Sequence, residues 1–79
     1  MIEQTLVERI TMNPNVMLGK PTIRNLRLTV EQILKALAGG VSIDELLEDY
    51  PELEIEDIQA IFLFSSELVH ETRLYPLAV

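Results

Sequence analysis

Apolar and polar residues alternate near the start of the chain, between Thr5 and Met12. The alternation has a period of two residues and includes β-branched side chains, which is typical of a strand. Asn13-Pro14-Asn15 then interrupts the pattern with residues that favour turns. We therefore predict an N-terminal β-strand over Thr5–Met12.

A β-hairpin is predicted next. Its two arms, Thr22–Arg24 and Arg27–Thr29, are joined at Asn25-Leu26. Asn tolerates the positive φ that a tight turn requires, whereas the following Leu does not favour a type I′ turn. We expect a type II′ turn or a slightly longer loop. In this register Arg24 lies opposite Arg27, and both arginines share one face of the hairpin.

Three amphipathic helices are predicted after the hairpin. The first begins at the N-cap Thr29 and the second at the N-cap Ser42, and each has Gln or Glu three residues later, which is a capping box. Gly39-Gly40 ends the first helix and Pro51 the second. The third helix runs from about Ile55 to Thr72.

The first two helices and their short connection have the layout of a helix–turn–helix. The predicted fold class is α+β and winged-helix-like, with a short N-terminal strand and hairpin before a three-helix bundle. One domain covers residues 1–79: the strand and hairpin in 1–30, the helices in 31–73 and an apolar tail in 74–79. The third helix is apolar around most of its circumference, so we expect a homodimer that buries Leu63, Phe64 and Leu68.

Charge is unevenly distributed along the 79 residues, whose net charge is −7. Residues 1–30 carry four basic and two acidic side chains, whereas residues 31–79 carry two basic and eleven acidic ones. The longest apolar run, Ala60–Phe64, is far shorter than the roughly 20 residues of a membrane helix. The chain has no cysteine and begins without a signal-peptide pattern. We expect a cytoplasmic protein with no membrane contact.

Several clusters together resemble the family catalogued as domain of unknown function 433. They are Gly19-Lys20-Pro21-Thr22-Ile23-Arg24, Arg27-Leu28-Thr29-Val30, Ile33-Leu34, Gly40, Tyr50-Pro51, Leu53 and Glu56-Asp57-Ile58. The resemblance covers about Ile10 to Phe64. It implies a small winged helix–turn–helix domain that is often dimeric. Members are commonly proposed to be antitoxins encoded beside a toxin with a PIN fold, which resembles ribonucleases. Here Asn25-Leu26 replaces the usual Gly-Thr, and Asn13-Pro14 replaces the usual Asp-Pro.

The basic hairpin is the candidate DNA- or anion-binding site, made of Lys20, Arg24, Asn25 and Arg27. Like charges that face each other across a hairpin destabilise it, so a neutralising group is needed. An acid of the same fold such as Glu31, or solvent, is one answer. A phosphate or a partner carboxylate, which arginine binds through two hydrogen bonds, is the other.

The second helix would be the recognition helix of a DNA-binding helix–turn–helix. Its outward residues are acidic: Asp44, Glu45, Glu48 and Asp49. Phosphates repel such a face, so we expect any contact with DNA to be made by the hairpin. The acidic face is either a solvated surface or the docking surface for a basic toxin.

Nothing in the sequence points to catalysis. The single histidine, His70, lies late in a helix, and Ser65-Ser66 has no local base. No metal site or cofactor is expected. The leading hypothesis is an antitoxin-like regulator that binds a PIN-like toxin, and that also binds its own promoter DNA through Arg24 and Arg27. The alternative is a homodimeric protein-interaction module without DNA binding.

Overall fold

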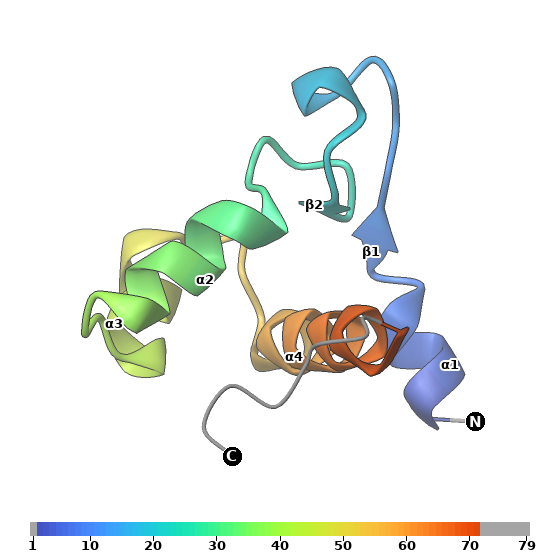
Figure 1. Cartoon of the computed structure of the whole chain (residues 1–79). Coiled ribbons are helices and arrows are strands. Elements are labelled where there is room, and N and C mark those ends of the chain that lie inside the picture. The colour runs from blue at the N-terminus through green and yellow to red at the C-terminus, as the bar shows by residue number, and fades with distance from the viewer. Residues whose placement is uncertain (1, 72–79) are drawn as a thin grey trace.

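The computed structural model describes the backbone of residues 2–71 and the side chains of residues 5–70. The predicted tail, residues 74–79, lies outside this part of the chain. The described part is α+β (Figure 1), with the order α1 (Ile2–Val7), β1 (Ile10–Thr11), the 3-10 helix η1 (Met17–Gly19), β2 (Thr22–Ile23), α2 (Val30–Ala38), α3 (Ile43–Asp49) and α4 (Ile55–Glu71).

The N-terminal segment differs from the sequence prediction. Ile2–Val7 forms α1, and only Ile10–Thr11 of the predicted strand Thr5–Met12 is a strand. Helix α1 lies against α4 (Figure 1). The alternation of period two was short, and packing of a helix against α4 outweighs so weak a local preference. The predicted strand is therefore wrong over its first half.

The central strand β2 has neighbours on both sides. On one side it pairs antiparallel with β1, with Thr11 opposite Thr22. On the other side a single bridge joins Thr22 to Thr29, and the N–H of Ile23 donates to the carbonyl of Leu28 at 3.1 Å. The predicted pairing of the two hairpin arms is confirmed, although the second arm contributes only this bridge.

Helices α2 and α3 begin as the sequence predicts. The N–H of Gln32 donates to Oγ1 of Thr29 at 3.0 Å, and the N–H of Thr29 donates to Oε1 of Gln32 at 2.9 Å. Ser42 and Glu45 make the same reciprocal pair at 3.1 and 3.0 Å. Both capping boxes are therefore confirmed, and they satisfy N–H groups that no helical carbonyl can reach.

The hydrophobic core lies between β2, α2, α3 and the first half of α4. Its buried members are Ile23, Val30, Ile33, Leu46, Leu53, Ile58 and Ile61. Further along α4 the apolar side chains are more exposed, and Leu68 keeps 54% of its surface in solvent. None of the described helices is long and apolar enough to cross a bilayer.

Candidate functional site

Asp57 is the centre of a polar network at the start of α4. Its side chain is fully buried. Nε and Nη2 of Arg24 donate to its two carboxylate oxygens at 3.0 and 2.9 Å, and Nη1 of Arg9 donates at 2.9 Å. The backbone N–H of Glu54 adds a bond of 2.8 Å. The network therefore ties the segment after α1 and the loop after β2 to α4.

The network fixes the charge of its members. Burial alone raises the pKa of Asp57, but hydrogen bonds from Arg24, the Glu54 N–H and Arg9 outweigh burial and hold that pKa below its usual value. Hydrogen bonding to Asp57 raises the pKa of Arg24. Hydrogen bonding to Glu54, at 2.7 Å, and to Asp57 raises the pKa of Arg9. All three of Asp57, Arg9 and Arg24 are charged at neutral pH.

The Arg24 side chain therefore binds other residues of the same chain. Besides Asp57, its Nη2 donates to the carbonyl of Glu52 at 2.6 Å. An acid of the same fold neutralises Arg24, and that acid is Asp57 and not Glu31. The two arginines of the hairpin do not act as one outward pair, because Arg27 lines a separate hollow.

The hairpin loop consists of residues 24–27, because Ile23 pairs with Leu28 as the predicted register requires. Within it, a tight turn has Arg24 and Asn25 as central residues, with φ of 46° and 61°, and the N–H of Leu26 donates to the carbonyl of Ile23 at 2.7 Å. Positive φ at both central positions is the geometry of a type I′ turn, so the predicted type II′ turn is wrong, whereas the alternative of a slightly longer loop is confirmed. A non-glycine residue in this region costs about 1–2 kcal/mol, and the bidentate bond of Arg24 to Asp57 offsets this cost.

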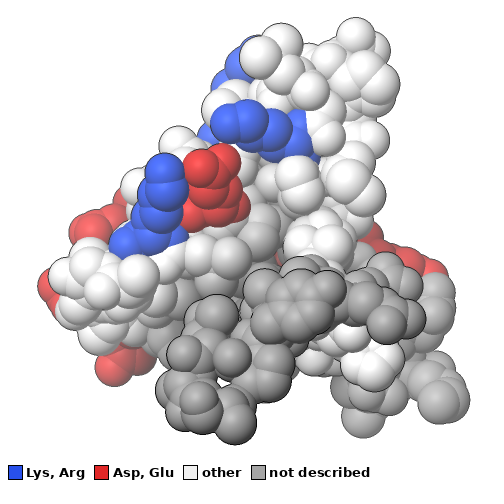
Figure 2. Space-filling model, in the orientation of Figure 1, with Lys and Arg blue, Asp and Glu red and all other residues white. Residues whose placement is uncertain are grey.

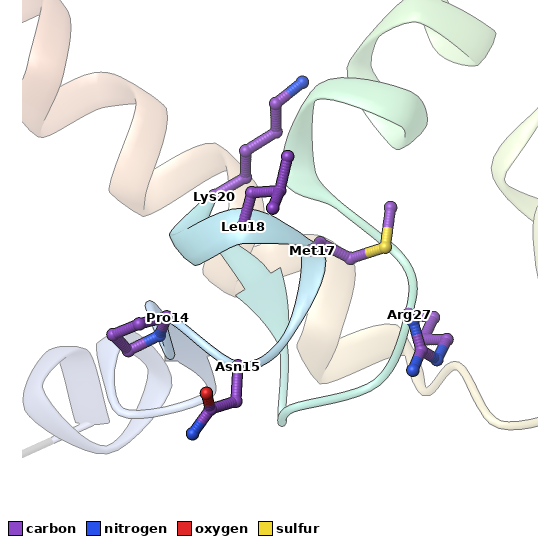
Figure 3. A pocket seen from close by; sticks show the side chains of 6 residues that line it. All are labelled: Pro14, Asn15, Met17, Leu18, Lys20 and Arg27. Atoms are coloured by element: carbon purple, nitrogen blue, oxygen red, sulfur yellow. The ribbon is translucent and has the colours of Figure 1, made fainter.

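Lys20 and Arg27 reach a hollow of about 410 Å³ beside η1 (Figure 3). The hollow is lined by Pro14, Asn15, Met17, Leu18, Lys20 and Arg27. Lys20 has one ion pair, with Glu31 at 3.5 Å, and Lys35 pairs with the same carboxylate at 3.2 Å. These pairs lower the pKa of Glu31, with the hydrogen bond from Lys35 as the largest cause. Figure 2 shows basic and acidic side chains side by side on this face.

The four outward carboxylates of α3 are exposed: Asp44, Glu45, Glu48 and Asp49. Glu45 accepts the N–H of Ser42, and this backbone hydrogen bond, followed by that of the Ser42 side chain, lowers its pKa. No ion pair joins any of the four to a cation within the side chains of residues 5–70. The sequence prediction of an acidic outward face on this helix is confirmed.

An apolar groove of about 440 Å³ lies between α2 and α4. Leu34 and Ala38 line one side, and Phe64 and Leu68 line the other. Two of the three residues predicted for a dimer interface are thus in the groove, whereas half-buried Leu63 is not among its lining residues.

Sequence reasoning missed the parts of this site that depend on distant contacts. From the sequence, Asp57 has no predicted site role, and Arg9 lies in the predicted strand Thr5–Met12. An acid three residues into a helix does signal a bond back to the N-cap backbone, and Asp57 makes such a bond to Glu54. No local pattern indicates its partner Arg24, which is 33 residues away.

The described residues contain no group of three or more His, Cys, Asp and Glu side chains that could hold a metal ion.

Comparison with known proteins gives a family match. The family model described as "Protein of unknown function (DUF433)" matches residues 10–65. Over 58 residues the chain is 29% identical to "Uncharacterized protein y4eO" of Sinorhizobium fredii (strain NBRC 101917 / NGR234). The match covers 73% of this chain and 26% of that relative, so the chain spans only a small part of the relative's length. No solved structure matches the chain.

Proposed function

The chain belongs to the DUF433 family of proteins of unknown function, and we propose that it is an antitoxin-like regulator that binds and neutralises a PIN-like toxin. The observation that carries the proposal is the exposed acidic face of α3. None of its four carboxylates forms an ion pair with a cation among the side chains of residues 5–70. Such a face complements a basic partner and increases the rate of encounter with it.

The PIN-like toxin is the partner class that the family resemblance implies. A ribonuclease-like protein presents cations to the phosphates of its substrate. The carboxylates of Asp44, Glu48 and Asp49 carry the same sign as those phosphates and compete for the same cations. Neutralisation is then steric, because the bound protein covers the toxin's RNA-binding surface.

Promoter DNA is the second candidate partner, in a winged helix–turn–helix arrangement whose wing is formed by residues 12–29. The supporting observation is that Lys20, Arg27 and Asn15 line one hollow beside η1 (Figure 3). Arg24 is near these residues in the sequence, but its guanidinium donates its hydrogen bonds to Asp57 and to the Glu52 carbonyl. We therefore leave Arg24 out of the proposed DNA contact. Asn25 holds the turn, accepting a bond of 3.4 Å from Asn13.

A homodimer in the cytoplasm completes the proposal. The groove between α2 and α4 supports it, because an apolar groove beside the exposed Leu68 is a surface that a second copy can cover. Two copies double the number of cations presented to DNA. The alternative function is a homodimeric interaction module without DNA binding, and the net charge of −7 favours it.

The test measures binding to the PIN-like protein encoded beside this gene, by titration calorimetry. We expect Asp44→Asn with Glu48→Gln to weaken the complex at least about tenfold, as loss of complementary charges does at protein interfaces. Glu52→Gln with Glu56→Gln is the matched control, because it removes the same charge from exposed residues outside α3. Equal affinity of both variants and the wild type, or no complex at all, contradicts the proposal.

A further inference from the structure

The segment around η1 is chemically unlike the rest of this acidic chain. No Asp or Glu occurs from residue 9 to residue 30, although the chain has thirteen in total. In Figure 1 this segment projects from the strands on the side away from α1 and α4. A projection without carboxylates is the part of the molecule that phosphates repel least.

Leu18 lies at the tip of this projection. Its side chain is 92% exposed, and its φ is 59°. Met17 before it and Gly19 after it also have positive φ, of 49° and 82°. Glycine or asparagine adopts this conformation more readily than leucine. Leu18 is therefore an apolar side chain exposed to solvent on a backbone conformation that is unfavourable for leucine. Packing within the protein does not explain why leucine is present at this position.

Two cations share the surface around Leu18. Lys20 and Arg27 line the same hollow as Leu18 (Figure 3). Among the described side chains Arg27 has no ion pair, and Lys20 has only the 3.5 Å contact with Glu31. Asn15 also lines the hollow, and asparagine is among the residues that read the minor groove.

We propose that Leu18 is a wedge that enters the minor groove of duplex DNA between two base pairs and bends the duplex. Lys20 and Arg27 contact the phosphates on either side. Minor-groove proteins that kink DNA insert single apolar side chains of this kind, with cations beside them. The proposal rests on the DNA contact in the proposed function and adds how that contact is made.

The shape of the tip favours DNA over a protein partner. A stable protein interface buries roughly 800 Å² on each side around an apolar centre, whereas the tip offers one projecting leucine, with Lys20 and Arg27 lining the same hollow. The acidic helix α3 does not prevent the contact. It lies away from η1 (Figure 1), and salt screens exposed charges beyond about 8 Å at physiological ionic strength.

The test uses the full chain and duplexes of about 25 base pairs that tile the DNA directly upstream of the gene. Anisotropy of a labelled duplex reports binding, and energy transfer between dyes at its two ends reports bending. We compare Leu18→Ala, Lys20→Gln with Arg27→Gln, and Met12→Ala. The last is the matched control, because Met12 is an exposed apolar residue outside η1.

We expect the wild type to bind and to increase end-to-end energy transfer. Leu18→Ala should keep binding within about fivefold and lose the bend, because the phosphate contacts remain. The double charge variant should weaken binding at least about tenfold and reduce the slope of log affinity against log salt by about 2. Met12→Ala should behave like the wild type.

Three results overturn the wedge. If the wild type binds without bending, or Leu18→Ala bends as well as the wild type, the wedge is wrong and the promoter contact stands. If no upstream duplex is retained, the wedge and the DNA contact both fail, whereas the toxin complex is judged by its own titration. Weaker toxin binding by Leu18→Ala, with DNA bending unchanged, would assign Leu18 to a protein interface.

Discussion

At the scale of single residues, Asp57 determines which arginines reach solvent. Its two oxygens receive three hydrogen bonds from Arg24 and Arg9 and one from the Glu54 backbone. A buried carboxylate without such partners would be strongly destabilising. Each arginine in turn gives up its availability to an external anion. Because Asp57 of α4 binds Arg9 and Arg24, the candidate DNA contact is limited to Lys20 and Arg27.

Replacing Asp57 by Asn tests this network. We expect the free energy of unfolding, measured by urea denaturation, to fall by about 2–3 kcal/mol. Removing one partner of a fully buried ion pair costs about 3–5 kcal/mol, and we reduce this because the side chains of Arg9 and Arg24 are 26% and 37% exposed. Glu54→Gln is the control and should cost less than about 1 kcal/mol, since Glu54 is exposed.

The Asp57→Asn variant should also differ from the wild type in how its stability depends on pH. The folded pKa of Asp57 is lowered, so its contribution is complete above the unfolded value of about 3.9 and is lost as the pH falls through the folded value. Wild-type stability should fall in this acid range more steeply than that of Asp57→Asn. Parallel stability–pH curves, or a stability loss below about 0.5 kcal/mol at neutral pH, would show that the network does not support the fold.

At the scale of elements, α2 and α3 depend on their N-caps. Helix α3 has only seven residues, from Ile43 to Asp49. Isolated helices shorter than about 12 residues are marginal in water, so the capping box of Ser42 and Glu45 and the burial of Leu46 must both contribute. The cap also holds the acidic face of α3 in place for a partner.

Ser42→Ala should lower the free energy of unfolding by about 1 kcal/mol, because the N–H of Glu45 loses its acceptor. Thermal and urea denaturation measure this change. Ser66→Ala is a suitable control, since Ser66 is exposed in the middle of α4 and should change stability by no more than about 0.5 kcal/mol. Equal effects of the two substitutions would show that the Ser42 cap does not stabilise α3.

At the scale of the whole molecule, three surfaces occupy different regions. Helix α3 carries exposed carboxylates, the η1 projection carries Lys20 and Arg27, and an apolar groove lies between α2 and α4. The proposed contacts with a basic protein, with DNA and with a second copy therefore involve different residues. Such an arrangement suits a small regulator whose activity lies in its contacts.

Leu68→Glu tests the groove as a dimer interface. We expect the variant to be a monomer by light scattering at concentrations where the wild type is a dimer, because burying an unpaired carboxylate in an apolar interface costs several kcal/mol. Val69→Glu is the matched control, since Val69 is exposed one residue further along α4 and does not line the groove. A wild-type monomer, or a dimeric Leu68→Glu, contradicts the dimer proposal.

The sequence alone predicted the helical half of the fold. The start of α2 at Thr29, the start of α3 at Ser42 and the span of α4 from Ile55 follow from signals within a few residues of each other. Capping boxes and apolar stripes act over three or four residues. These signals lie within or next to each helix, so the sequence pattern shows where the helices begin, even though a short helix such as α3 also needs burial in the fold.

Only the tertiary structure decided the rest. Residues 2–7 form a helix because they pack against α4, which outweighs a short alternating pattern. Arg24 faces inward because it meets Asp57, 33 residues further along the chain. Local sequence patterns hold no information about pairs this distant, since folding brings them together. The sequence pattern therefore predicts helices α2, α3 and α4 and the basic character of the hairpin, whereas contacts between distant residues determine which of the hairpin's cations remain available to a partner.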